Sequence, residues 1–273
     1  SHFLKAALRA LSVEEHSSVI QGLLGRITTC LSGFLPPAVR RDLAPRTADR
    51  LLELARAATA GSDKQLQLVR ALSAHAVTDE QLDAVTGLLE GTTALDGLDV
   101  DQDLRWDLLT GLVAAGRFGE EQIRTEEDRD RTTTGRERAA EARAAIPTPK
   151  AKQTTWRALV DDASMPNETQ VRVLRGLANV ERHPELLEPF VAEYVDIIDS
   201  VWSSRTFHMA ENLLTGLWSC VTVGLDGVDP AAALEGWLGS HAEAPAALRR
   251  IVRENLDDTR RTARAQAAEI SGQ

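Results

Sequence analysis

Hydrophobic side chains recur every three or four residues along most of the chain, which is the period of an α-helix. Such residues form apolar stripes, for example in residues 104–115 and 248–263. Each stripe gives a helix one broad apolar face, which it can bury against its neighbours. The clearest stripe consists of Leu186, Leu187, Phe190, Val191, Tyr194, Val195, Ile198, Val201 and Trp202.

Start and stop signals agree with this helical period. Ser62 and Thr78 each stand three residues before a glutamine, the spacing of a capping box. Thr148 and Asp229 each precede a proline, which the first position of a helix tolerates. Glycines that favour helix ends follow four of the periodic runs: Gly61, Gly91, Gly116 and Gly239.

These signals predict an all-α fold with short connections, so consecutive helices should pack as antiparallel neighbours. We expect stacked antiparallel helical hairpins that form a HEAT- or armadillo-like superhelix. A globular bundle is the alternative, because no fixed repeat period is evident. The one β-like stretch, residues 220–223, is too short to build a sheet and is predicted as a loop. The predicted helices cover residues 2–11, 13–32, 38–60, 63–75, 79–90, 101–115, 119–128, 133–145, 149–162, 167–178, 184–203, 205–221, 229–239 and 244–269.

The composition supports a folded core. The chain has 273 residues, of which 43% are hydrophobic. Trp202 and Trp218 fall on apolar helical faces, and both are predicted to be core residues. The two cysteines, Cys30 and Cys220, are far apart in sequence and are predicted to be free thiols in a reducing compartment, with Cys30 buried.

The net charge of −10 argues against a nucleic-acid partner, because phosphate binding needs an excess of clustered lysine and arginine. It also argues against binding to an anionic membrane surface. No apolar run approaches the roughly 18 residues of a membrane span. The sequence therefore predicts a soluble, cytoplasmic protein.

Two segments are rich in charge. Residues 120–143 hold eight acids and six arginines with interleaved signs, which is typical of an exposed helix pair with contacts between residues four apart. The predicted C-terminal helix carries six arginines. An acidic partner surface is one interpretation of those arginines. We favour the other, salt bridges to neighbouring helices.

No catalytic constellation is present in the sequence. No two of the six histidines lie three to five residues apart, as in the zinc motif H-E-x-x-H. The nucleophile elbow and the glycine-rich phosphate loops are also missing. Asp99, Asp101 and Asp103 resemble part of a calcium loop, but an acidic N-cap for the helix at Leu104 explains them more simply. We therefore predict no enzyme activity and no metal site in this chain.

Four stretches, in chain order, resemble the helical C-terminal domain of the gluzincin zinc aminopeptidases, in particular the actinobacterial aminopeptidase N group. They are residues 95–109, 144–156, 201–205 and 248–267. Turn residues match as well as apolar ones, and the likeness covers essentially the whole chain. In that family the H-E-x-x-H motif and a G-A-M-E-N segment lie in an upstream domain, and this sequence contains neither.

The resemblance implies that residues 1–273 are a single helical C-terminal domain, with the catalytic domain and its zinc upstream. Its function would be to cap the substrate chamber of an enzyme that removes N-terminal residues from peptides. Its partners would be the upstream domain of the same polypeptide and peptide substrates. The family domain begins somewhat before Ser1, which leaves open that the first helices are missing. The alternative is a free-standing HEAT-type scaffold that binds a protein partner.

A chamber that accepts peptides must meet their C-terminal carboxylate, and the planar fork of arginine suits that contact. Following the resemblance, we predict three peptide-binding candidates. Arg105 begins a helix after the acidic linker, Arg205 lies at a turn between two long helices, and Arg249 opens the last helix. For Arg105 the alternative is a structural ion pair with Asp101.

Overall fold

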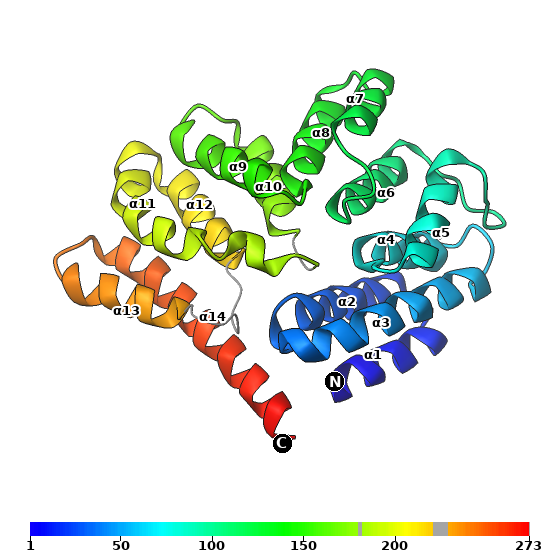
Figure 1. The fold of residues 1–273 in the computed structure, drawn as a ribbon, viewed down its shortest axis with the longest axis horizontal. Coiled ribbons are helices and arrows are strands. Elements are labelled where there is room, and N and C mark those ends of the chain that lie inside the picture. The colour runs from blue at the N-terminus through cyan, green and yellow to red at the C-terminus, as the bar shows by residue number, and fades with distance from the viewer. Residues whose placement is uncertain (180–181, 221–228, 273) are drawn as a thin grey trace. The chain divides into compact units, whose positions relative to one another are not determined.

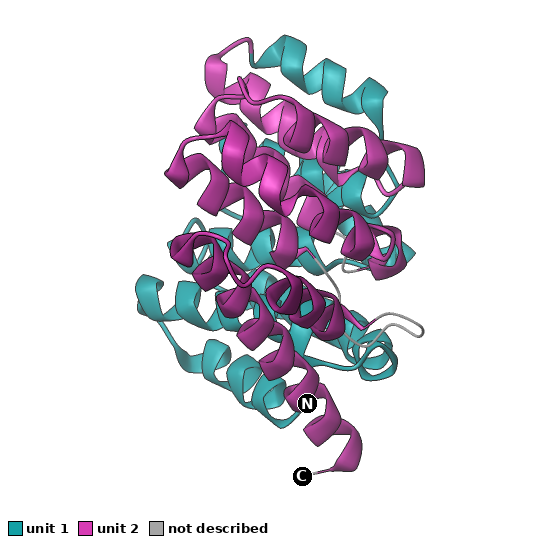
Figure 2. Ribbon diagram, turned by 90° about the vertical axis from the view of Figure 1, so that its left-hand side faces the viewer, with its two compact units in different colours: residues 1–130 teal, residues 131–273 magenta. Residues whose placement is uncertain are grey.

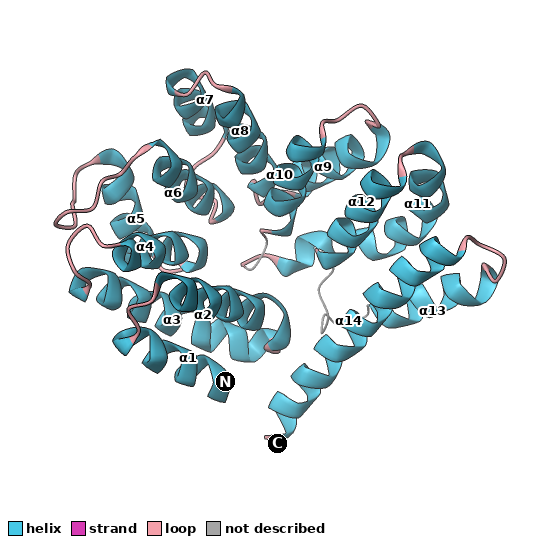
Figure 3. Cartoon of the chain, turned by 180° about the vertical axis from the view of Figure 1, so that it is seen from behind, coloured by secondary structure: helices cyan, strands magenta, loops and turns pink. Residues whose placement is uncertain are grey.

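The computed structural model of the chain describes residues 1–179, 182–220 and 229–272. These residues form fourteen α-helices, one π-helical turn and one 3₁₀ turn, and no strand (Figures 1 and 3). The predicted all-α fold is confirmed. The helices are α1 (His2–Val13), α2 (Ser17–Thr29), α3 (Pro37–Ala57), α4 (Asp63–His75), α5 (Asp79–Glu90), α6 (Gln102–Ala114), α7 (Glu120–Arg129), α8 (Thr133–Ala145), α9 (Pro149–Asp161), α10 (Asn167–Ala178), α11 (Phe190–Ser204), α12 (Phe207–Ser219), α13 (Pro230–Ser240) and α14 (Ala246–Ser271).

Two predicted helices differ from the observed ones. The predicted helix 13–32 starts only at Ser17, because the Glu14 carboxylate accepts hydrogen bonds from the two following backbone N–H groups and closes a local turn. It ends in the π-helical turn Cys30–Phe34. The predicted helix 184–203 is also wrong at its start. It consists of a 3₁₀ turn, Pro184–Leu187, and then α11, because Pro189 has no N–H group and cannot continue a helix.

The capping predictions hold with one change. Thr78 and Gln81 form the full capping box: the hydroxyl accepts from the Gln81 N–H, and the Gln81 side chain accepts from the Thr78 N–H. Ser62 also accepts from the N–H of Gln65. The Gln65 side chain, however, accepts from the N–H of Gly61 at 2.9 Å instead of that of Ser62. The box at Ser62 is therefore only half formed.

Two further predicted caps form. Thr148 and Asp229 cap α9 and α13, each by accepting from the N–H three residues on. Gly239 does not end a helix, since α13 continues to Ser240. Of the β-like stretch, Cys220 ends α12, and residues 221–223 lie outside the described residues.

The chain divides into two compact units, residues 1–130 and 131–273 (Figure 2). In the first unit α2, α4 and α6 pack in one layer, and α1, α3 and α5 form a second layer beside it. In the second unit α8, α10, α12 and α14 form one layer, and α11 and α13 pack together in the other. Each unit is thus a stack of helical hairpins. The curvature of a whole superhelix stays a prediction.

Close helix contacts in each unit depend on glycine. A Cβ added at Gly111 of α6 would lie 2.2 Å from the Ser73 hydroxyl oxygen of α4. One added at Gly176 of α10 would lie 2.1 Å from the backbone oxygen of Glu141 in α8. Since real Cβ atoms do not approach other atoms so closely, the two helix pairs can pack this tightly only through glycine.

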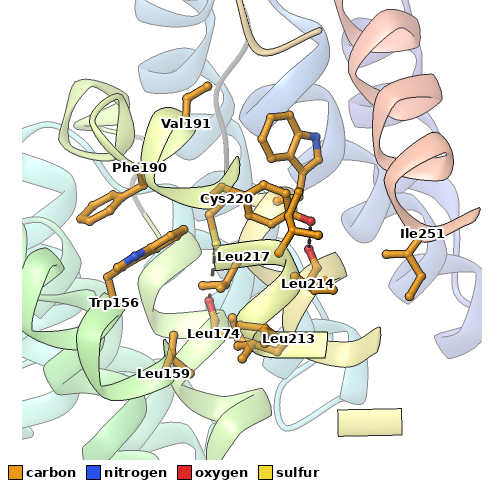
Figure 4. Close-up of a cluster of buried hydrophobic side chains, with 14 of the residues drawn as sticks. Trp156, Leu159, Leu174, Phe190, Val191, Leu213, Leu214, Leu217, Cys220 and Ile251 are labelled. Carbon is orange, nitrogen blue, oxygen red and sulfur yellow. Dashed lines mark hydrogen bonds between the residues drawn. The ribbon is translucent and has the colours of Figure 1, made fainter. Parts of the chain in front are cut away.

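The second unit has an aromatic core (Figure 4). Trp156 stacks on Phe190 with ring centroids 4.6 Å apart, and Tyr194 packs against Trp218 at 4.7 Å. Trp218 is only 4% exposed, which confirms it as a core residue. The prediction for Trp202 is wrong, because this side chain is only partly buried. It lies in the last turn of α11, where it meets the edge of an exposed phenylalanine of α12, Phe207.

Candidate functional site

No metal-binding group is assembled among the described residues. No three of their histidine, cysteine, aspartate and glutamate side chains are placed to hold a metal ion. Cys30 and Cys220 are free thiols, and Cys30 is buried, as predicted; Cys220 is buried as well. Burial raises the pKa of the Cys220 thiol to about 12, so that the nucleophilic thiolate form is disfavoured.

The first unit contains a cavity of about 570 Å³ beside Arg105. It lies among the C-terminal end of α5, the connection from α5 to α6, the start of α6, and α7. Its walls combine apolar side chains with polar and charged ones, which include Glu90, Arg129 and the pair Arg105 and Glu126. The apolar lining residues include Leu88, Leu95, Leu98, Leu109 and Phe118. An apolar pocket with a few polar groups is the usual form of a small binding site.

Arg105 and Glu126 make a two-pronged ion pair at this cavity. The arginine Nη2 and Nε atoms lie 2.7 and 2.8 Å from the two carboxylate oxygens, and Gln102 donates a further hydrogen bond to Glu126. Burial tends to raise the pKa of Glu126, but these hydrogen bonds outweigh it and hold the pKa below its usual value. The predicted partner of Arg105, Asp101, instead caps α6 by accepting from the Leu104 N–H.

The three candidate arginines share a role that the sequence did not reveal. Each donates to carbonyl oxygens at the C-terminal end of a preceding helix, where carbonyls lack intrahelical partners. Arg105 donates to Leu89 of α5 at 2.9 Å. Arg205 donates to the last turn of α9, with its Nη2 atom 2.7 Å from the oxygen of Val160. Arg249 donates to carbonyls at the end of α13.

The three arginines do not converge on one helix end. Arg105 belongs to the first unit, and Arg205 and Arg249 contact different helices of the second. Of the three, only Arg105 lines the 570 Å³ cavity. The sign of this role in the sequence is that each arginine lies within a few residues of a helix start.

The charge-dense segment 120–143 is not simply an exposed face. The pair Arg124 and Glu120 is exposed and spaced four apart, as predicted. In contrast, four charged residues of the segment are buried, because they pair with other charged or polar side chains. For example, Glu141 lies 3.2 Å from both Arg138 and Arg172. The four are Glu126, Asp130, Arg138 and Glu141.

Two of the six arginines of α14 form the predicted salt bridges to neighbouring helices. Arg250 lies 2.9 Å from Glu211 of α12, and Arg260 lies 2.8 Å from Glu235 of α13. These pairs are exposed and contribute about 0–1 kcal/mol each. None of the helices in the described ranges is both long enough and apolar enough to cross a membrane.

Comparison with known proteins gives two matches. The model of the family described as the ERAP1-like C-terminal domain matches residues 1–261. Aminopeptidase N of Streptomyces lividans is 39% identical over 269 residues, which cover 98% of this chain and 31% of that protein. The chain therefore spans about a third of the length of this curated relative.

Proposed function

This chain belongs to the ERAP1-like C-terminal domain family, and we propose that it is the non-catalytic C-terminal domain of a zinc aminopeptidase that removes N-terminal residues from peptides. The observation that carries the proposal is the match to an aminopeptidase N over 98% of the chain but only 31% of the relative. The zinc of the parent enzyme belongs, in this proposal, to an upstream catalytic domain. A cytoplasmic setting is part of the proposal, and the two free thiols support it.

The role proposed for the domain is to cap the substrate chamber. Stacked hairpins suit such a role because they present an extended surface held by a continuous core. A capping domain restricts access by its shape and needs no nucleophile, base or metal ligand. The match to an aminopeptidase does not favour the free-standing scaffold.

We expect the 273-residue chain alone to leave aminoacyl-arylamide substrates uncleaved and to hold no stoichiometric zinc. The longer polypeptide that contains it should cleave them and hold one zinc ion per chain. Arylamide assays and metal analysis of both proteins test this. An inactive, zinc-free long polypeptide would overturn the proposal.

The capping role has a separate measurement. Deleting this chain from the longer polypeptide should change the turnover of long peptides relative to that of the small arylamide, because only long peptides reach the cap. An unchanged ratio, with the catalytic part still folded and loaded with zinc, would contradict the capping role.

Arg105, Arg205 and Arg249 are proposed to contact the peptide, and Arg105 has the strongest support. It lines the cavity of about 570 Å³, whose apolar residues suit the side chain beside a carboxylate. Its Nη atoms each carry two N–H groups, and each has one partner described above, so each Nη atom has one further N–H group that can donate to an anion.

Removing Arg105 should therefore weaken the binding of a peptide carboxylate. Because its loss alone would leave Glu126 buried without its cation, the test variant is R105Q/E126Q. In the longer polypeptide we expect kcat/KM for a peptide with a free carboxylate to fall about tenfold more than that for its amide. R205A and R249A test the other two arginines. If all three variants keep the parent's ratio of kcat/KM between the two peptides, none of these residues binds the carboxylate.

A further inference from the structure

Two charged side chains of the cavity in the first unit lie outside the ion pair of Arg105 and Glu126. Glu90 lines the cavity from the last residue of α5, and Arg129 lines it from the last residue of α7. Both are exposed. In the part of the chain that the structure describes, neither side chain makes a hydrogen bond or a salt bridge. The cavity therefore offers one carboxylate and one guanidinium that are free to bind a ligand.

These two charges belong to different walls of the cavity. No salt bridge joins Glu90 to Arg129, although both line the same cavity. Beside Glu90, the carbonyl groups at the end of α5 add partial negative charge. An acid at this end opposes the helix dipole, so helix stability alone does not explain Glu90. On the other wall, the positive charge of Arg129 acts on the Glu126 carboxylate, which Arg105 already neutralises.

The apolar part of the lining can gain contacts from a ligand. Leu88, Leu89 and Leu109 are buried in their helices. Other apolar lining residues belong to the connections between helices and are only partly buried, so a ligand that covers them removes further apolar surface from water. The volume of about 570 Å³ is within the usual range for a small-molecule site. These partly buried residues are Leu95, Leu98, Val100 and Phe118.

The charges and the apolar lining together define one kind of ligand. A simple anion would be repelled by Glu90, and a simple cation would be repelled by Arg129, whereas a zwitterion satisfies both. In a free amino acid the two charged groups share one carbon atom, but an extended dipeptide holds them about 6–7 Å apart and can reach separate walls.

We propose that this cavity binds a small zwitterionic peptide with apolar side chains, with its ammonium group at Glu90 and its carboxylate at Arg129. Both contacts are charge-assisted hydrogen bonds, and the planar guanidinium can hold both carboxylate oxygens. The inference goes beyond the proposed function, which brings only the carboxylate of a long peptide to Arg105. It concerns a ligand that lies wholly within the cavity, and it needs no catalytic domain.

A binding titration of the 273-residue chain tests this site. The probe is leucyl-leucine, and the shifts of leucine methyl groups in NMR spectra report its binding. N-acetyl-leucyl-leucine lacks the ammonium group, and leucyl-leucine amide lacks the carboxylate. The variants E90Q and R129Q remove the two protein charges. Their matched controls are E80Q on α5 and R124Q on α7, which change exposed residues outside the cavity lining.

We expect leucyl-leucine to bind at one site per chain and to shift the methyl groups of the cavity leucines. E90Q and R129Q should each weaken its binding at least about tenfold, the loss of one hydrogen bond between charged groups. E80Q and R124Q should keep the parent's Kd. E90Q should not weaken the acetylated peptide further, and R129Q should not weaken the amide further, because the partner group is already missing.

Four results would overturn the proposal. They are the absence of saturable shifts, binding that E90Q and R129Q leave unchanged, acetylated peptide that binds as tightly as leucyl-leucine, and leucine that binds as tightly as the dipeptide. The third would show a site for an apolar carboxylate without an ammonium contact. Since no measurement depends on zinc or turnover, a failure of this site is distinguishable from a failure of the aminopeptidase assignment.

Discussion

The W218A variant is expected to unfold with a free energy about 3–5 kcal/mol lower than that of the parent chain. The Trp218 side chain is almost fully buried among apolar residues of α12, α11 and α14. Its ring packs against Tyr194, and its Nε1 atom donates to the Thr259 hydroxyl at 2.8 Å. Alanine removes the ring, leaves a cavity and takes away the donor of a buried hydrogen bond.

The matched control for this variant is W202A, which removes the same side chain from a partly buried position. Because part of that side chain stays in contact with water, the expected loss is only about 1–2 kcal/mol. Denaturant unfolding of the two variants, followed by circular dichroism, gives both values. Equal losses would contradict the burial difference on which the prediction depends.

The second large effect is expected at Lys152 of α9, an ammonium group with no exposed area. Its Nζ atom donates to the oxygen of Ala144 at 2.7 Å, near the end of α8. It also lies 3.4 Å from the oxygens of Gly176 and Leu177, near the end of α10. The negative ends of two helix dipoles thus hold a buried cation. Burial nevertheless lowers the pKa of Lys152 from 10.5 to about 8.

Stability should therefore rise with pH above the folded-state pKa of Lys152. Between the pKa values of about 8 in the folded chain and 10.5 in the unfolded chain, the unfolded state binds more protons, so raising the pH favours folding. Cys220 acts in the opposite direction above its ordinary pKa of 9, because burial raises its pKa to about 12. Removing this thiol separates the two effects.

In a C220A background we expect the free energy of unfolding to rise by about 2–3 kcal/mol between about pH 7 and pH 10. The double variant C220A/K152M should lack this rise, since methionine has a similar length and does not titrate. Denaturant titrations at several pH values provide the comparison. A slope that persists in the double variant would show that Lys152 is not its source.

Local signals in the sequence determined most of the helix boundaries. The box at Thr78 and the caps at Asp101 and Asp229 form as predicted, because a cap needs only residues within one turn of each other. The helical period of the hydrophobic residues is also a local pattern, and it predicted the all-α fold class. The predicted start of α11 is wrong because Pro189 has no N–H group and cannot continue a helix from the turn Pro184–Leu187.

The family was also accessible from the sequence, since turn residues match in order along the whole chain. The cavity was not, because it is made where the connection after α5 lies over α6 and α7. Through the resemblance, the sequence proposed Arg105 as a contact for a peptide carboxylate, but the ion-pair partner that it offered for Arg105, Asp101, was wrong. The partner, Glu126, is 21 residues away.

Only the tertiary structure determined which polar groups are buried and which groups they contact. Arg205 reaches carbonyls 45 residues or more away in sequence, and Lys152 lies between the ends of two helices. A helical period shows which face is apolar, but it says nothing of the neighbour that covers a charge. The hydrogen-bond partners of long side chains are set only when the helices pack, because the acceptors lie at helix ends that are distant in sequence.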